Sequence, residues 1–174
     1  MVKCWLTSTF SENVSPTIGA AFIKSTYEYR GLERNIQVWD TAGEEQYRSV
    51  TSIYCRDAFA AMIVYDKCNR ASFENIPYWI DLVTKQGQIP IVVCGNKNDL
   101  NSETEITLQE AAEFSSQYNV SHFFTSARTQ FGIFDAFSEL LDLAFERQEN
   151  LPKDDVVPSV QQSLEPESKK LCCF

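Results

Sequence analysis

The segment IPIVVCGNKND, from Ile89 to Asp99, joins a continuous apolar run to a cluster of polar residues. A second run, AFAAMIVYD from Ala58 to Asp66, has the same character. Strands of a parallel sheet are buried on both faces, so they read as unbroken apolar runs rather than as alternating ones. The two segments therefore predict strands of a buried parallel sheet.

Around these two runs the chain alternates between β-rich and helical patterns. The β-rich segments are residues 18–30, 35–40 and 122–127, and the helical segments are residues 70–85, 107–118 and 132–148. Gly31 marks a turn between the first two strands, and Thr107 with Glu110 forms the capping-box pattern of a helix start. This alternation predicts a doubly wound α/β sheet, in which ligands bind beyond the carboxyl ends of the strands.

The composition sets the broad class of protein. The chain has 174 residues, 44% of them hydrophobic, which suits one compact domain (residues 1–148) followed by a flexible tail (residues 149–174). A formal net charge of −9 argues against a nucleic-acid partner, because phosphate backbones are bound by clustered Lys and Arg. No apolar run approaches the ~20 residues of a membrane span. Cys55, Cys68 and Cys94 lie in or beside apolar runs, so we expect reduced thiols and a cytosolic protein.

The polar residues GNKND after the second apolar run are candidates for recognising a base. The carboxylate of Asp99 can accept two hydrogen bonds, from the N1–H and the exocyclic amine of guanine, an arrangement that adenine cannot match. The stem of Lys97 can lie on the base, and the amide of Asn96 can hold the loop together. The alternative is an ordinary polar turn between a strand and a helix, because Asn, Asp and Gly are common turn residues.

Three shorter motifs point to a phosphate and a metal ion. In WDTAG, Asp40 at a strand end can hold Mg²⁺ through water, and Gly43 lets a backbone N–H approach a γ-phosphate. In PTIG, the hydroxyl of Thr17 is a suitable Mg²⁺ ligand. TSAR, residues 125–128, ends a strand and could present N–H groups to a base. Each motif alone could equally be an ordinary turn.

Taken together, the four motifs resemble a known family. PTIG, WDTAGEEQYRS, GNKND and TSAR occur in the order found in Ras-like small GTPases, and SIYCRDAFAAMIVYD with the terminal CCF looks like the Rab branch. The resemblance extends from about Val2 to Gln148 and to the end of the tail. It implies a P-loop NTPase-like α/β fold, with a mostly parallel sheet covered by helices on both faces, and a site for GTP or GDP with Mg²⁺.

The resemblance assigns roles to individual residues. Thr17 and Asp40 match the Mg²⁺-linked positions, Gly43 the γ-phosphate-sensing glycine and Glu44 the catalytic position. The positions that match the guanine site are Phe10, Asn96, Lys97, Asp99, Ser126, Ala127 and Arg128, where Arg128 replaces the usual lysine. Phe22, Trp39 and Tyr54 match the aromatic triad that Rab proteins present to effectors. Core packing is the simpler interpretation of Phe10 from spacing alone, and it is the alternative for the triad.

Glu44 departs from the family, which has a glutamine there. The glutamine amide orients the attacking water and can donate a hydrogen bond to the transition state. A carboxylate can only accept hydrogen bonds, and its charge faces a polyanionic phosphate group. Since removing one preorganised donor costs ~10²–10³ in rate at comparable sites, the sequence predicts slow intrinsic GTP hydrolysis.

The second departure is an absence: the sequence contains no GxxxxGK[ST] phosphate-binding loop. By family spacing this loop and the first strand would precede Met1, and residues 1–10 match the helix that follows. The sequence therefore predicts two strands without a shared partner, a large apolar gap and poor GTP binding. Two explanations are open: a truncated reading frame, or a nucleotide-free pseudo-GTPase that acts through protein contacts alone.

The tail ends in KKLCCF. A C-a-a-X box needs its cysteine fourth from the end, where this chain has Leu171. The ending instead resembles the doubly geranylgeranylated terminus of Rab proteins, on Cys172 and Cys173. Two lipid chains suffice for stable anchoring, and Lys169 with Lys170 adds a small attraction to anionic leaflets. Two unmodified, exposed thiols are the alternative.

The resemblance implies a monomeric GTP/GDP switch for vesicle traffic. Its partners would be effector proteins, exchange and activating factors, and the prenylation escort machinery. It would act on the cytoplasmic face of intracellular membranes, with a cytosolic pool, and TIGAAF (residues 17–22) looks like the early-endosomal branch. A non-catalytic, prenylated interaction module is the competing function.

Overall fold

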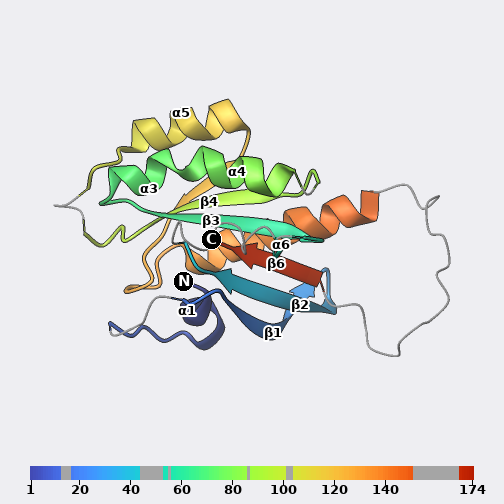
Figure 1. The fold of residues 1–174 in the computed structure, drawn as a ribbon. Coiled ribbons are helices and arrows are strands. Elements are labelled where there is room, and N and C mark those ends of the chain that lie inside the picture. Colours follow the sequence, from blue (N-terminus) through green and yellow to red (C-terminus); the bar gives the residue numbers. More distant parts are fainter. Residues whose placement is uncertain (13–16, 44–52, 55, 86, 101–103, 151–168) are drawn as a thin grey trace.

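The computed structural model describes residues 1–12, 17–43, 53–54, 56–85, 87–100, 104–150 and 169–174. The described residues form a six-stranded sheet in the order β1-β2-β6-β3-β4-β5 (Figure 1). The strands are β1 (Ala20–Tyr29), β2 (Leu32–Thr41), β3 (Ala60–Asp66), β4 (Ile91–Asn96), β5 (Ser121–Phe124) and β6 (Lys169–Cys173). Only the β1–β2 pair is antiparallel among the pairs of this sheet, so the predicted mostly parallel α/β sheet is confirmed.

Helices cover both faces of the sheet. They are α1 (Val2–Thr7), α3 (Arg70–Glu74), α4 (Ile76–Thr84), α5 (Leu108–Tyr118) and α6 (Ile133–Asn150). One buried cluster contains side chains of α1 and α6, and a second contains side chains of α4 and α5. Figure 1 shows α3, α4 and α5 together on one side of the strands, with α1 and α6 on the other. No helix in the described part of the chain has the length and apolar character needed to cross a membrane.

The local sequence explains most element boundaries. Arg30 and Gly31 both have positive φ, at 51° and 75°, and form a two-residue turn between the paired Tyr29 and Leu32. Positive φ at both central residues is the geometry of tight hairpins, and glycine adopts it without steric cost. At the start of α5, Thr107 and Glu110 form the predicted capping box.

The single helix predicted over residues 70–85 is two helices. α3 ends at Glu74 and α4 begins at Ile76, with Asn75 between them. Pro77 stands in the first turn of α4, where its missing N–H is least costly, but that N–H would have been needed to continue α3. The proline therefore divides the helical pattern.

The centre of the sheet differs most from the sequence prediction. The predicted flexible tail, residues 149–174, ends in a strand, because Lys169–Cys173 forms β6. β2 and β3 therefore do have a shared partner, since β6 lies between them and runs parallel to both (Figure 1). The side chains of Leu171, Cys172 and Cys173 are 1%, 0% and 2% exposed. This strand forms because the apolar residues at the end of the chain can fill the apolar gap that was predicted between β2 and β3.

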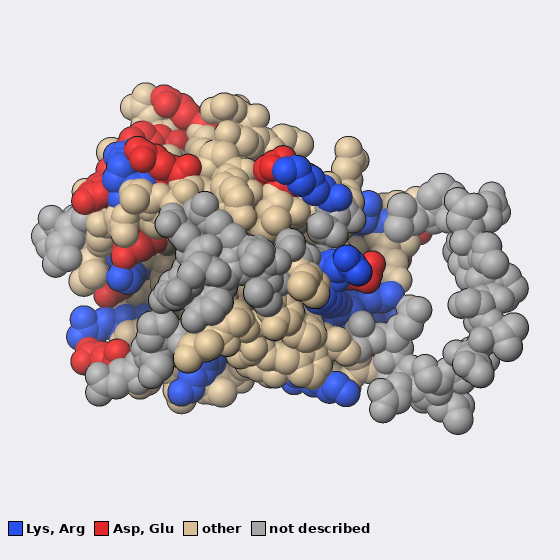
Figure 2. All heavy atoms as spheres, viewed as in Figure 1, with Lys and Arg blue, Asp and Glu red and all other residues tan. Residues whose placement is uncertain are grey.

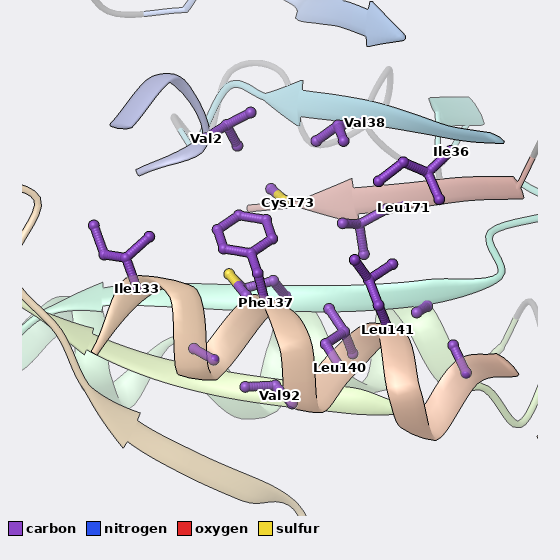
Figure 3. Packing of buried hydrophobic residues seen from close by; sticks show 14 of the residues in the cluster. Val2, Ile36, Val38, Val92, Ile133, Phe137, Leu140, Leu141, Leu171 and Cys173 are labelled. Carbon is purple, nitrogen blue, oxygen red and sulfur yellow. The ribbon is translucent and has the colours of Figure 1, made fainter. Parts of the chain in front are cut away.

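The main core lies between α6 and the sheet. Figure 3 shows Phe137 and Leu141 of α6 pointing towards Cys173 and Leu171 of β6, with Val38 of β2 beyond them. These five residues are at most 2% exposed. The last strand is therefore an integral part of the core rather than an addition at its edge.

Candidate functional site

A pocket lies beyond the carboxyl ends of β4 and β5. It has a volume of about 300 Å³ and is lined by Phe10, Glu12, Asn96, Lys97, Asp99, Leu100, Ala127 and Arg128. Six of the seven residues predicted for the guanine site line this pocket. The seventh, Ser126, is buried behind it and contacts Asp99. The structure thus brings together three segments that are far apart in the sequence.

Backbone and amide hydrogen bonds join the two loops of the pocket. Asn96 Oδ1 accepts a hydrogen bond from the Ala127 N–H at 3.0 Å, and the Asn98 N–H donates to the Thr125 carbonyl at 3.0 Å. Gly95 passes directly beneath Tyr65, where an added Cβ would lie 2.6 Å from the tyrosine oxygen. Asn96 therefore does hold the loops together, and the close packing at Gly95 fixes the strand end that carries it.

Asp99 is held by its neighbours before any ligand arrives. Its Oδ1 accepts a hydrogen bond from Ser126 Oγ at 2.6 Å. Ser126 is 1% exposed, and its oxygen also accepts the Thr129 N–H at 3.1 Å. A carboxylate has about four lone-pair positions, so this bond leaves acceptors that can face the pocket. The arrangement is a preorganised acceptor beside an apolar wall that includes Phe10.

Lys97 is positioned by Asp66, a residue that the sequence analysis did not single out. Lys97 Nζ lies 2.6 Å from Asp66 Oδ2, and this hydrogen bond raises the pKa of the lysine. Asp66 Oδ1 accepts the Cys68 N–H at 2.9 Å, so both carboxylate oxygens are engaged. The only sequence signal for this contact was that the strand of residues 58–66 ended in a polar residue.

Glu12 lines the pocket and was also missed by sequence reasoning. Its Oε1 lies 3.2 Å from Arg128 Nη2 at the mouth of the pocket, and both side chains are largely exposed. An exposed pair of this kind contributes little stability, about 0–1 kcal/mol. Its position still matters, because it joins the loop after α1 to the loop after β5. Glu12 belongs to no motif, so no pattern could have indicated it.

The residues predicted for Mg²⁺ and phosphate lie at the open end of the β1–β2 hairpin. Ala20 pairs with Thr41, and the Ala42 N–H donates to the Gly19 carbonyl at 2.8 Å, which brings Thr17 and Gly43 to the end where Asp40 lies. Burial raises the pKa of Asp40, an effect that the Met1 amino group partly opposes. Asp40 also pairs in register with Cys173 of β6.

The described residues offer few ligands for a metal ion. The described residues include no group of three or more His, Cys, Asp or Glu side chains arranged to hold a metal ion. Thr17 and Asp40 offer oxygen ligands for Mg²⁺ at the open end of the β1–β2 hairpin. Glu44, the predicted catalytic position, lies outside the described residues.

The three aromatic residues predicted to face effectors form one cluster. The ring centroids of Phe22 and Trp39 are 5.0 Å apart, and those of Trp39 and Tyr54 are 5.4 Å apart. Phe22 is 43% exposed, and Lys170 Nζ lies 5.0 Å from the Trp39 ring. Figure 2 shows a broad, largely uncharged area over β1 and β2, with charged side chains around it. The triad therefore lies together and at least partly open to solvent.

Comparisons with known proteins agree with this arrangement. The Ras family model matches residues 1–146. Ras-related protein Rab-17 of Mus musculus is 32% identical over 168 residues, covering 92% of this chain and 78% of the relative. Ras-related protein Rab-27A of Rattus norvegicus is 31% identical (94% and 84% covered), and Ras-related protein RABA4b of Arabidopsis thaliana is 33% identical (94% and 80%). The chain belongs to the Ras family of small GTPases and is Rab-like within it.

Proposed function

We propose that this protein is a Rab-like, guanine-binding component of membrane traffic that selects the base through the pocket beyond β4 and β5. The observation that carries the proposal is the preorganised Asp99, held by buried Ser126 at the wall of the 300 Å³ pocket. Its carboxylate accepts hydrogen bonds from the N1–H and exocyclic amine of guanine. Adenine presents an acceptor at N1 and no amine at C2, so it would leave the carboxylate unpaired.

The same geometry predicts selectivity for the base. The carboxylate of Asp99 distinguishes guanine from adenine by up to two hydrogen bonds to a charged group, each contributing ~1.5–3 kcal/mol.

A fluorescent GDP analogue, titrated with competitors, tests this proposal. We expect displacement by guanosine and by GDP, and no displacement by adenosine. Circular dichroism of the same sample checks that it is folded. A folded sample that binds neither guanosine nor GDP would overturn the proposal.

Glu44 also belongs to the proposed function, as the residue that slows hydrolysis. Replacing it with glutamine restores the missing donor, so single-turnover GTP hydrolysis at saturating nucleotide should accelerate by up to about 10²–10³-fold. Glu45→Gln removes a neighbouring carboxylate and serves as the matched control, with no comparable gain. A Glu44→Gln protein that hydrolyses GTP no faster than the native chain would contradict this role.

Effector recruitment is proposed for the Phe22–Trp39–Tyr54 cluster. Clustered, partly exposed aromatic residues suit a protein interface, and the uncharged area over β1 and β2 extends it. Exchange and activating factors would act at the nucleotide side. Membrane attachment through lipidated Cys172 and Cys173, with the help of an escort, would place the protein on intracellular membranes while a monomeric pool stays in the cytosol.

A second function, a nucleotide-free interaction module, is favoured by one observation. β6 occupies the centre of the sheet and packs in the main core, so side chains of the chain itself fill this part of the described residues. The module would use the same aromatic cluster and need no base in the pocket. The competition titration separates the two functions, since only the first requires guanosine to bind.

A further inference from the structure

β6 is held in the sheet by hydrogen bonds along both of its edges. It pairs with Ile36–Asp40 of β2 and with Ala60–Met62 of β3. Beyond the ladder, the Phe174 N–H donates to the Met62 carbonyl at 3.0 Å, and the Val64 N–H donates to the Phe174 carbonyl at 2.9 Å. Thr41 Oγ1 adds a bond of 2.8 Å to the Cys173 carbonyl. The segment is thus seated as a central strand, without an edge of its own.

The side chains of β6 are sealed on both faces of the sheet. Leu171 and Cys173 belong to the cluster that α6 covers, whereas Cys172 packs with Ala58 on the opposite face. The Phe174 ring stacks on Trp79 with centroids 5.3 Å apart. No reagent or enzyme can reach either sulfur while the strand is seated.

The chemistry of the sulfur atoms reinforces this shielding. The nucleophile in alkylation is the thiolate rather than the thiol. Cys173 is 2% exposed, so no base can reach its thiol to remove the proton while the strand is seated. The Cys172 thiol contacts the Tyr54 carbonyl at 3.2 Å. Modification of either residue therefore requires the strand to leave.

The arrangement of the chain allows such a departure. β6 is the last element of the structure, so it can leave without carrying another strand with it. α6 keeps further core contacts, such as the stacking of Phe137 on Trp5 at 4.3 Å. Residues 151–168, which join α6 to β6, could span about 60 Å when extended, so the chain's own strand can reach its place.

We propose that Lys169–Phe174 is a removable strand of this protein, and that its cysteines can be modified only when it has left the sheet. The strand and the modification exclude one another: a seated strand completes the core, and a modified strand cannot return to it. The inference does not depend on nucleotide binding. Release exposes Leu171 and Phe174 and leaves the edges of β2 and β3 unpaired, so the seated form predominates.

Thiol labelling of the native full chain with N-ethylmaleimide tests the proposal. Mass spectrometry gives the labelling rates of Cys172 and Cys173 and of Cys94, which is 0% exposed in β4. A synthetic peptide of residues 165–174 gives the rate of the free segment. We expect the two terminal cysteines to react at least about 100-fold more slowly than the peptide, faster than Cys94, and with a weaker dependence on urea than Cys94.

Three outcomes would overturn the proposal. Labelling at the rate of the peptide would mean that the strand is not seated in solution. Labelling that follows Cys94 at every urea concentration would mean that the strand leaves only when the whole domain unfolds. Protection that falls on dilution, with elution as a dimer, would mean that the strand comes from a second copy. The labelling rate, its urea dependence and the elution volume together distinguish the three outcomes.

Discussion

Replacing Asp99 with asparagine is expected to change the preference of the pocket from guanine to xanthine. The carboxylate accepts both the N1–H and the exocyclic amine of guanine, whereas an asparagine amide would direct its NH₂ against that amine. Xanthine carries a carbonyl in place of the amine, so the asparagine NH₂ can donate to it. The lost hydrogen bond between the amine and a charged group, at ~1.5–3 kcal/mol, corresponds to a loss of about 10–10²-fold in guanosine affinity, and the two opposed NH₂ groups add to this loss.

Competition titrations with guanosine and xanthosine measure this change directly. Asparagine retains an acceptor for Ser126 Oγ, so the loop should keep its conformation. Asp135→Asn, at an exposed position of α6, is the control and should leave both affinities unchanged. An unaltered ratio of guanosine to xanthosine affinity in the Asp99→Asn protein would show that this carboxylate does not contact the base.

The second large effect is expected from Leu171→Ala in β6. Leu171 is 1% exposed and packs in the α6 core, and truncation of such a leucine costs about 2–5 kcal/mol. The substitution destabilises the seated state alone, because Leu171 makes no core contacts in a released strand. Maleimide labelling of Cys172 and Cys173 should therefore accelerate by about 30- to 5,000-fold, up to the rate of the free peptide.

Leu108→Ala provides a matched control for this substitution. Leu108 opens α5 and is 71% exposed, so the same truncation removes little buried surface there and should change labelling by less than about threefold. Cys94 labelling in each variant reports whether the domain as a whole has unfolded. If Leu171→Ala and Leu108→Ala gave the same rates, the tail would be a solvated segment and β6 would not contribute to the core.

Much of the fold could be predicted from local sequence because its strands carry clear patterns. The apolar runs that became β3 and β4 are buried on both faces, and that burial is what makes them apolar throughout. β6 could not be predicted in this way. Its five residues follow a tail rich in proline and charge, and their pairing depends on partners more than 100 residues earlier in the chain. A local pattern contains no information about such a partner.

The residues of the candidate site also divide into those that the sequence predicted and those that it did not. Asn96 and Asp99 were predicted because a polar motif follows a buried strand, at the edge where ligands bind. Ser126 was predicted only because the chain resembles Ras-like small GTPases. Asp66 and Glu12 were missed because each acts through a single ion pair, with Lys97 and Arg128. Such a pair depends on the final distance between two loops. Residue type and spacing along the chain do not encode that distance.

The position of β6 also has a consequence for how this protein is made. Its hydrogen bond from Thr41 to Cys173 closes a separation of 132 residues, and the strand enters the middle of the sheet rather than its edge. Domains generally fold as units during synthesis, and contacts of high sequence separation form slowly. β2 and β3 are therefore synthesised long before the strand that joins them. Their facing edges stay unpaired in the nascent chain until residues 169–174 emerge. Chaperones that bind exposed strand edges would have their longest opportunity in that interval.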